Sequence, residues 1–298
     1  MANFKIKNGL HSAGYTQNKS TITAATGMTT SFLQTTGENS NWVQKTADIS
    51  SYGGATVRSV YHYDMIANVF TADVQLDNIV IGGNTYNFTS NATGWQTTTT
   101  DTAIGSYDSA TFTDVATGTT AGRVNRDSGG TPSNGTGATT DADGSGSGHY
   151  LYFETTSPAN SAAYDFLLRG PSITLPNNPT WTWFENRTGT SMGNLDAYLH
   201  LEAAHAIVDL SKGTYFNFTP TAATSLSFIN SPATGFGFSF AIEVTNSSSY
   251  ALTWPSSIKW QGGSTPSATA AGKTDLYTFI TVDGGTTYFG KKAVEGLS

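Results

Sequence analysis

The chain has 298 residues and no cysteine, and only 12% of its residues are charged, about half the usual share. Its net charge is −7 and it has no run of Lys and Arg that could neutralise phosphates, so general nucleic-acid binding is not expected. No stretch is long and apolar enough to form a transmembrane helix, so membrane insertion is not expected either. The polar surface must therefore consist mainly of Thr, Ser, Asn and Gly side chains.

Residues 1–40 are polar, with two short strand-like pieces at residues 4–7 and 20–24. Two readings stay open at this point: a disordered tail, or an arm that docks on a neighbour or on the C-terminal part of the chain. The first eight residues contain no apolar run of the kind that a signal peptide needs. We therefore expect synthesis in a cytoplasm.

Residues 41–148 begin with three predicted strands and continue in a loop-rich region. The strands are expected at residues 42–49, 55–63 and 73–81, because the turn signal Gly53-Gly54 separates the first two apolar segments and Gly82-Gly83-Asn84 follows the third. Residues 96–148 are mostly Thr, Ser, Gly and Asp, with weak strands at residues 110–115 and 121–124. The rest of this stretch should form long surface loops.

Residues 126–199 hold a glycine-rich loop followed by a series of short alternating segments. The loop covers residues 126–137, and the next strand is expected at residues 146–154. In residues 195–199, the side chains of Leu195, Ala197 and Leu199 alternate with those of Asp196 and Tyr198. A period of two over such short segments indicates half-buried β-strands.

Residues 201–298 are expected to form a second β-unit. Phe236, Phe238, Phe240, Ile242 and Val244 alternate over five steps and should share one face of a strand. Residues 275–290 read as strand, Asp-Gly-Gly turn and strand, and therefore as a β-hairpin.

The central region resembles the MAM domain, a β-jelly-roll related to the concanavalin A-like sandwiches. The resemblance rests on the Gly-Thr-Gly loop ending at Gly137, the strand Gly146-Ser-Gly-His-Tyr-Leu-Tyr152, the aromatic segment 181–184 and Met192-Gly-Asn-Leu195. Animal MAM domains carry cysteines, which this chain lacks. The resemblance therefore implies the fold, while the adhesion partners of those receptors do not follow from it.

The order of the MAM-like pieces is circularly permuted. The segment Asp77-Asn-Ile79 matches a late part of the family pattern, whereas residues 86–95 match its start. We expect residues 41–200 to form one permuted jelly-roll, in which Val74 and Leu76 pack beside Leu195 and Leu199. In the alternative, residues 41–83 complete the sandwich of a neighbouring subunit.

Residues 205–290 resemble a domain of structural and fibre proteins of tailed phages. The residues that carry this resemblance are Val208 to Pro220, Leu252-Thr-Trp-Pro255, Lys259-Trp-Gln-Gly-Gly263 and Thr274 to Tyr288. In such proteins a segment like residues 7–13 often directly precedes this domain. The jelly-roll would then be an insertion, and residues 1–25 would belong to the C-terminal unit.

Asp141 and Asp143 are the candidate metal ligands. Asp141-Ala-Asp-Gly-Ser145 places hard oxygen ligands at alternating positions before a glycine turn, which suits Ca²⁺, although the downstream Glu of a calcium loop is missing. The alternative is a solvated acidic loop. No other cofactor is expected. His200 and His205 have the wrong spacing for a zinc motif.

The sequence shows no catalytic constellation, so we expect no enzymatic activity. The few glutamates do not form the carboxylate cluster of glycosidases on related sandwiches, and neither a nucleophile elbow nor a phosphate loop is present. Five tryptophans could stack on sugars, although most tryptophans in a β-sandwich belong to the core. They are Trp95, Trp181, Trp183, Trp254 and Trp260.

Together these features predict an all-β protein: a MAM-like jelly-roll sandwich at residues 41–200, a small C-terminal β-domain at residues 201–298, and an arm at residues 1–40. The resemblance and the composition imply a non-enzymatic virion structural protein, displayed on the outside of a phage tail, fibre or capsid. Its partners would be other virion proteins and further copies of itself, as a trimer. The alternatives are a glycan-binding adhesin that recognises a host surface and, third, a polysaccharide hydrolase.

Overall fold

The computed structural model of the chain describes residues 19–66, 70–131, 136–145, 148–156 and 164–298. The predicted segments 4–7 and 7–13 lie outside the described residues, as do parts of the glycine-rich loop. The described residues form β-strands joined by loops, with three short 3₁₀ turns, which confirms the all-β class. The turns are Ser50–Tyr52, Ile104–Ser109 and Leu210–Lys212. No helix among these residues is long and apolar enough to cross a membrane.

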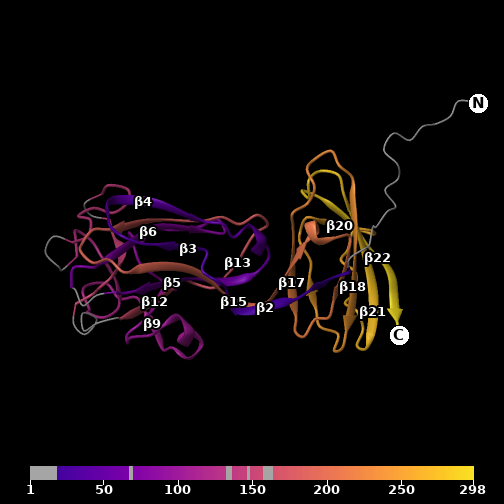
Figure 1. The fold of residues 1–298 in the computed structure, drawn as a ribbon, viewed down its shortest axis with the longest axis horizontal. Helices are drawn as coiled ribbons and strands as arrows, with labels where there is room; N and C mark the ends of the chain where they lie inside the picture. Colours follow the sequence, from indigo (N-terminus) through magenta and orange to yellow (C-terminus); the bar gives the residue numbers. More distant parts are fainter. Residues whose placement is uncertain (1–18, 67–69, 132–135, 146–147, 157–163) are drawn as a thin grey trace, which may run out of the picture. The chain divides into compact units, whose positions relative to one another are not determined.

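The chain divides into two compact units. The larger unit, here called the sandwich, is Thr26–Ala203; the smaller unit is Ala204–Ser298 together with the N-terminal segment that ends at Ala25. The sandwich thus begins about fifteen residues before the boundary expected from the sequence, because strands at residues 26–35 pair within it. Figure 1 shows both units as layers of strands.

The first sheet of the sandwich has the strand order β10-β11-β6-β14-β4, with β7 paired to β6. All of these pairs are antiparallel. The strands are β4 (Asn39–Ala47), β6 (Val74–Ile81), β7 (Asn84–Tyr86), β10 (Val124–Asp127), β11 (Tyr150–Phe153) and β14 (Trp181–Arg187).

The second sheet of the sandwich runs β15-β5-β12-β8-β9, with β13 paired to β5 and with β2 and β3 paired to β15. Its strands are β2 (Ala24–Met28), β3 (Leu33–Thr35), β5 (Thr56–Asp64), β8 (Gln96–Thr98), β9 (Phe112–Asp114), β12 (Asp165–Arg169), β13 (Ile173–Thr174) and β15 (Asn194–Asp209).

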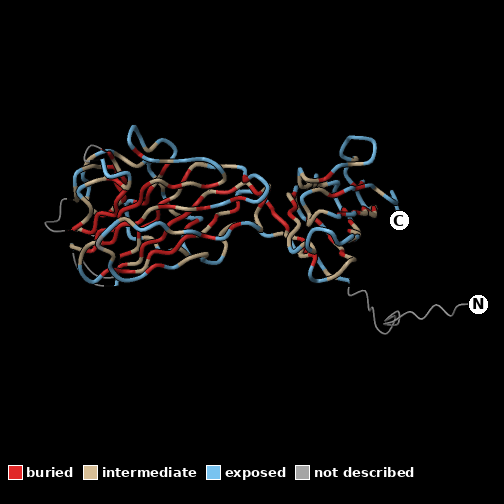
Figure 2. The backbone as a smooth tube through the Cα atoms, turned by 90° about the horizontal axis from the view of Figure 1, so that it is seen from above, coloured by how far each residue is buried: buried red, intermediate tan, exposed pale blue. Residues whose placement is uncertain are grey.

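One apolar core lies between the two sheets of the sandwich. Because side chains alternate along each strand, Val74 and Leu76 of β6 face the same core as Leu195 and Leu199 of β15. The segment 41–83 thus pairs and packs with later strands of the same chain, while the permuted MAM-like order stays a prediction. Figure 2 shows the buried residues along the strands and the exposed residues mainly in the connections.

The smaller unit contains a sheet of order β1-β16-β18-β21-β22-β20. Its N-terminal strand β1 pairs in parallel with β16, and β18, β21 and β22 are antiparallel neighbours. In addition, β17 pairs with the second half of β15, and β19 pairs with β17. The strands are β1 (Lys19–Ile22), β16 (Tyr215–Phe218), β17 (Thr224–Ile229), β18 (Phe238–Asn246), β19 (Leu252–Thr253), β20 (Ile258–Trp260), β21 (Lys273–Thr281) and β22 (Tyr288–Leu297).

The structure confirms the predicted hairpin and corrects two other expectations. β21 and β22 pair across the Asp-Gly-Gly turn. Phe236 precedes β18 and is 67% exposed, so it does not share the buried face of Phe240, Ile242 and Val244. Residues 200–205, at the predicted boundary between the two units, continue β15 without a break, because pairing with β5 persists to Leu201 and pairing with β17 begins at Ala204.

Candidate functional site

The glycine-rich loop covers a polar face of strand β6. Val74 and Leu76 face the core, so Gln75 and Asp77 point to the other side of the sheet, where both are buried. The residues that follow the loop supply one hydrogen bond to each: the backbone N–H of Ala138 donates to Gln75 Oε1 over 2.6 Å and that of Ala142 donates to Asp77 Oδ2 over 3.0 Å. Gly137 lies so close that a Cβ there would be 2.5 Å from Gln75 Nε2. This approach explains the glycine in the predicted Gly-Thr-Gly loop.

Asp141 and Asp143, the predicted calcium ligands, lie beside a third acid, Asp77. Asp141 Oδ1 accepts a hydrogen bond from the backbone N–H of Ser145 over 2.7 Å, and Asp143 Oδ1 accepts one from Asn78 Nδ2 over 2.8 Å. Each carboxylate thus already anchors the loop. Among the described residues no three His, Asp or Glu side chains are placed to hold a metal ion. Calcium binding by Asp141 and Asp143 stays a prediction. Asp143 links this segment to Asn78 of β6, whereas Asp141 closes a turn within the segment.

The carboxyl of Asp77 is the group most affected by this arrangement. Its pKa is raised to about 7, chiefly by burial and in smaller part by the nearby Asp141 and Asp143, while backbone N–H groups that donate to Asp77 act in the opposite direction. The sequence could not show this cluster, because 64 residues separate Asp77 from Asp141 and the contact depends on how the loop folds back.

Asp73 and Glu154 form a second pair of buried acids. Burial raises the pKa of both carboxyls, and the charge of Asp73 raises that of Glu154 further. Thr155 donates to Asp73 Oδ1 from its backbone N–H over 3.1 Å and from its hydroxyl over 2.8 Å. Both acids are fully buried, and neither lines the pockets described below. The arrangement is therefore that of a buried polar network.

His200 and His205 do not converge. Both lie on β15, where a spacing of five residues places side chains on opposite faces of the strand. His200 Nε2 lies 3.1 Å from Asp108 Oδ1, whereas the ring nitrogens of His205 lie 2.9 and 3.1 Å from the hydroxyls of Ser225 and Ser227. The two histidines thus have separate polar partners on opposite faces of the strand.

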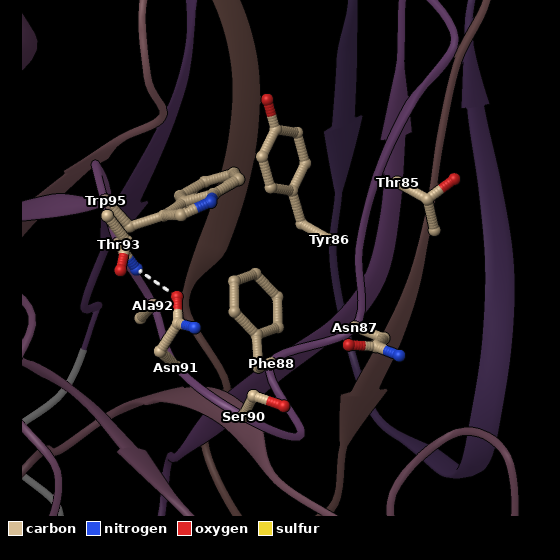
Figure 3. Close-up of a pocket in the computed structure, with 9 residues that line it drawn as sticks. All are labelled: Thr85, Tyr86, Asn87, Phe88, Ser90, Asn91, Ala92, Thr93 and Trp95. Carbon is tan, nitrogen blue, oxygen red and sulfur yellow. Dashed lines mark hydrogen bonds between the residues drawn. The ribbon is translucent and has the colours of Figure 1, made fainter.

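A small pocket opens in the segment from Thr85 to Trp95, shown in Figure 3. The rings of Tyr86 and Phe88 each meet Trp95 at nearly a right angle, with centroids 5.4 Å away. Phe88 has a positive φ of 57°, an unfavourable conformation for a bulky residue. Arg126 holds this strained turn, because its guanidinium donates to the carbonyls of Phe88 and Thr89.

The pocket of Figure 3 is too small for most ligands. Its volume is about 140 Å³, below the roughly 300–1,000 Å³ of small-molecule sites. Trp95 Nε1 is buried and has no hydrogen-bond acceptor among the described residues. Part of the polar rim is used internally, since Asn91 Oδ1 accepts the backbone N–H of Thr93 over 2.9 Å, the dashed line in Figure 3. The pocket has room for water or one small polar group.

The five candidate tryptophans separate into two groups. Trp95, Trp181 and Trp183 are at most 1% exposed and belong to the core of the sandwich, so they are unavailable for stacking on a sugar. Trp254 and Trp260 are only partly buried and line a second pocket, of about 370 Å³, in the smaller unit. The sequence identified these two residues as candidates, but it gave no basis for choosing them over the three core tryptophans.

Comparisons with known proteins bring no further information about this site: no family model, no curated protein and no solved structure matches the chain. The interpretation of function therefore depends on the residues and on the geometry described above.

Proposed function

We propose that the chain is a non-enzymatic structural protein of a tailed-phage particle, in which the smaller unit mediates assembly and the sandwich is displayed. The proposal is supported by the resemblance of residues 205–290 to phage structural and fibre proteins. It also agrees with the low charge of the chain and its surface rich in Thr, Ser, Asn and Gly.

The observation that carries the proposal is an apolar patch on the smaller unit, formed by Phe236, Ile280, Val282 and Phe289. Each of these side chains is more than half exposed. Ile280 and Phe289 are direct cross-strand partners, and the backbone N–H of Gly235, next to Phe236, donates to the carbonyl of Val282 over 3.1 Å. Contiguous exposed apolar groups of this kind mark protein–protein contacts. The occupant that we propose is another copy of the chain, within a homotrimer.

Sedimentation velocity of the purified full-length chain tests this assembly role. We expect the wild-type protein to sediment as a trimer and the variant Phe289→Lys to sediment as a monomer, because a charge would be buried in the interface. Ile66→Lys is the matched control, since Ile66 is 62% exposed but lies in the sandwich. A wild-type chain that stays monomeric at tens of micromolar, or a Phe289→Lys variant that assembles normally, would refute the role of this patch.

Glycan-binding adhesion is the second candidate function, and the partly exposed Trp254 and Trp260 are the observation that favours it. The third candidate, polysaccharide hydrolysis, has less support. Neither of the two pockets described above is lined by Asp or Glu, whereas glycosidases place a pair of carboxylates on either side of the bond they cleave. Release of reducing ends from a host polysaccharide by the purified chain would support the hydrolase function.

A further inference from the structure

We infer that Trp254 and Trp260 form a saccharide-binding site on the smaller unit, which takes a neutral or acidic pyranose ring. The inference stands apart from the proposed particle role, because it requires neither a trimer nor other virion proteins. It deepens the second candidate function, glycan binding, by naming the site and the class of ligand.

The indole rings of Trp254 and Trp260 lie nearly perpendicular to each other. Their centroids are 5.4 Å apart and their planes meet at 76°. Both rings are partly exposed and line the same pocket. A pyranose presents an apolar C–H face that packs flat on an aromatic ring, while its edge carries hydroxyl groups. An L-shaped pair of rings can therefore contact the face of a sugar and one of its edges simultaneously.

Buried aromatic residues of β21 pack against both indole rings and fix their positions. Trp254 packs against Tyr277 and Phe279 with centroid distances of 4.8 and 5.5 Å, and Trp260 packs against the same two rings at 6.2 and 5.7 Å. Tyr277 and Phe279 are at most 1% exposed. The indoles are thus pre-organised, so that little side-chain freedom would be lost when a ligand binds.

The size and chemistry of the pocket suit a sugar. Its volume of about 370 Å³ falls within the roughly 300–1,000 Å³ typical of small-molecule sites. Ser256, Thr265 and Lys259 are among the lining residues, none of which is acidic. Gly262 and Gly263, at φ of 82° and 80°, form the adjoining turn and place no side chains beside Trp260. A cation has no counter-charge in this lining, whereas sugar hydroxyls or a uronate would find hydrogen-bond donors.

Fluorine NMR of the full-length chain, labelled with 5-fluorotryptophan, tests the site. The probes are methyl glucoside, methyl galactoside, methyl N-acetylglucosaminide and methyl glucuronide, with uridine monophosphate as a flat aromatic competitor. Substitution of single tryptophans by Phe assigns the signals. We expect at least one glycoside to shift the signals of Trp254 and Trp260 saturably, while those of Trp95, Trp181 and Trp183 stay in place.

Variants separate a binding role from a packing role. Trp254→Ala and Trp260→Ala should each weaken the affinity at least about tenfold, as expected for a central aromatic contact. Trp260→Phe keeps an aromatic ring at this position, so it should lose less affinity for the glycoside than Trp260→Ala does. Leu297→Ala is the control: Leu297 is 52% exposed at the end of β22, outside both the pocket lining and the apolar patch.

An unchanged calorimetric transition of the smaller unit in each variant shows that the unit is still folded. The inference is overturned if no glycoside shifts either signal, if only uridine monophosphate does, or if the Trp→Ala variants bind as the wild type does. Because affinity for a single glycoside is measured, loss of trimer formation alone would not abolish the signal.

Discussion

Arg187 is a charged residue inside the core of the sandwich, and its burial determines what it contributes. Its side chain and that of Glu185 are at most 1% exposed, with Arg187 Nε 3.6 Å from Glu185 Oε1. The guanidinium also donates to the backbone carbonyls of Gly37 and Gly193, so strand β14 is linked to the segments on both sides. Glu185 in turn accepts from the hydroxyl of Thr35 over 2.9 Å. If one partner is removed, the other charge is left buried.

Substitution of Arg187 by Met should lower the free energy of unfolding of the sandwich by about 3–5 kcal/mol, since Glu185 would lose its counter-charge. Urea denaturation followed by tryptophan fluorescence measures this. Asp108→Ala is the control: Asp108 pairs with His200, but its side chain is 83% exposed, so its loss should change stability by less than about 1 kcal/mol. Equal effects of the two substitutions would contradict the buried ion pair.

Asp77 makes the stability of the sandwich depend on pH. Its pKa is about 7 in the folded protein, because it is buried beside Asp141 and Asp143, against an ordinary value of 3.8. The folded state therefore binds the proton more tightly than the unfolded state does. The resulting stabilisation is complete below about pH 4 and is lost as the pH rises through 7.

We expect Asp77→Asn to flatten the pH dependence of the melting temperature between pH 4 and pH 8, because the amide keeps an acceptor for Ala142 without the charge. Calorimetry in EDTA measures this and removes any calcium effect at Asp141 and Asp143. The buried acids Asp73 and Glu154 also contribute to the profile, so the informative quantity is the difference between variant and wild type. A difference that does not change with pH would show that Asp77 titrates normally.

At the scale of the elements, strand β1 completes a sheet whose other strands follow more than 180 residues later. It pairs with β16, and its residue Ile22 is buried in the core of the smaller unit, whereas Thr21 is exposed.

Ile22→Ala should destabilise the smaller unit by about 2–5 kcal/mol through the lost contacts and the cavity. Thr21→Ala, on the other face of the same strand, should change it by less than about 0.5 kcal/mol. Separate unfolding transitions in calorimetry distinguish the units, and an unchanged transition for Ile22→Ala would show that β1 is dispensable.

Strands with strict alternation could be predicted from the sequence, and elements defined by distant pairing could not. The alternation in β18 and the Asp-Gly-Gly turn before β22 are local signals, and both elements formed where expected. The continuity of β15 through His200 and His205 was missed, because its second half is fixed by parallel pairing with β17. Phe236 was assigned to the buried face because it continues the alternation of apolar residues, although the strand begins only at Phe238.

For the candidate sites, the sequence shows which residue types are present, but not which of them are accessible or lie next to one another. Tryptophans can be read from the sequence, but burial decides which of them a ligand can reach, and burial follows from the packing of the sheets. The same holds for the acids: Asp141 and Asp143 carry a local calcium-like pattern, while the neighbouring Asp77 comes from strand β6. The contact between Trp254 and Trp260 depends on both rings packing on β21.

At the scale of the whole molecule, the two units have separate cores. The core of the sandwich uses residues between Ala47 and Leu201, and that of the smaller unit uses Ile22 with residues from Ala206 onward. The fragment Thr26–Ala203 should therefore fold alone and unfold cooperatively, with a melting temperature close to that of the sandwich in the full chain. Near-UV circular dichroism and calorimetry measure this. A fragment without a cooperative transition would show that the sandwich depends on the rest of the chain.

The central claim is that the chain is a displayed component of a phage particle. The most direct measurement is electron microscopy of intact particles, purified from lysates of cells that make the chain and labelled with gold-conjugated antibodies against the fragment Thr26–Ala203. The account predicts gold at a regular position on the particle exterior, and peptides of the chain in the purified particles. Particles that carry neither the label nor the peptides, while the chain remains in the particle-free lysate, would contradict it.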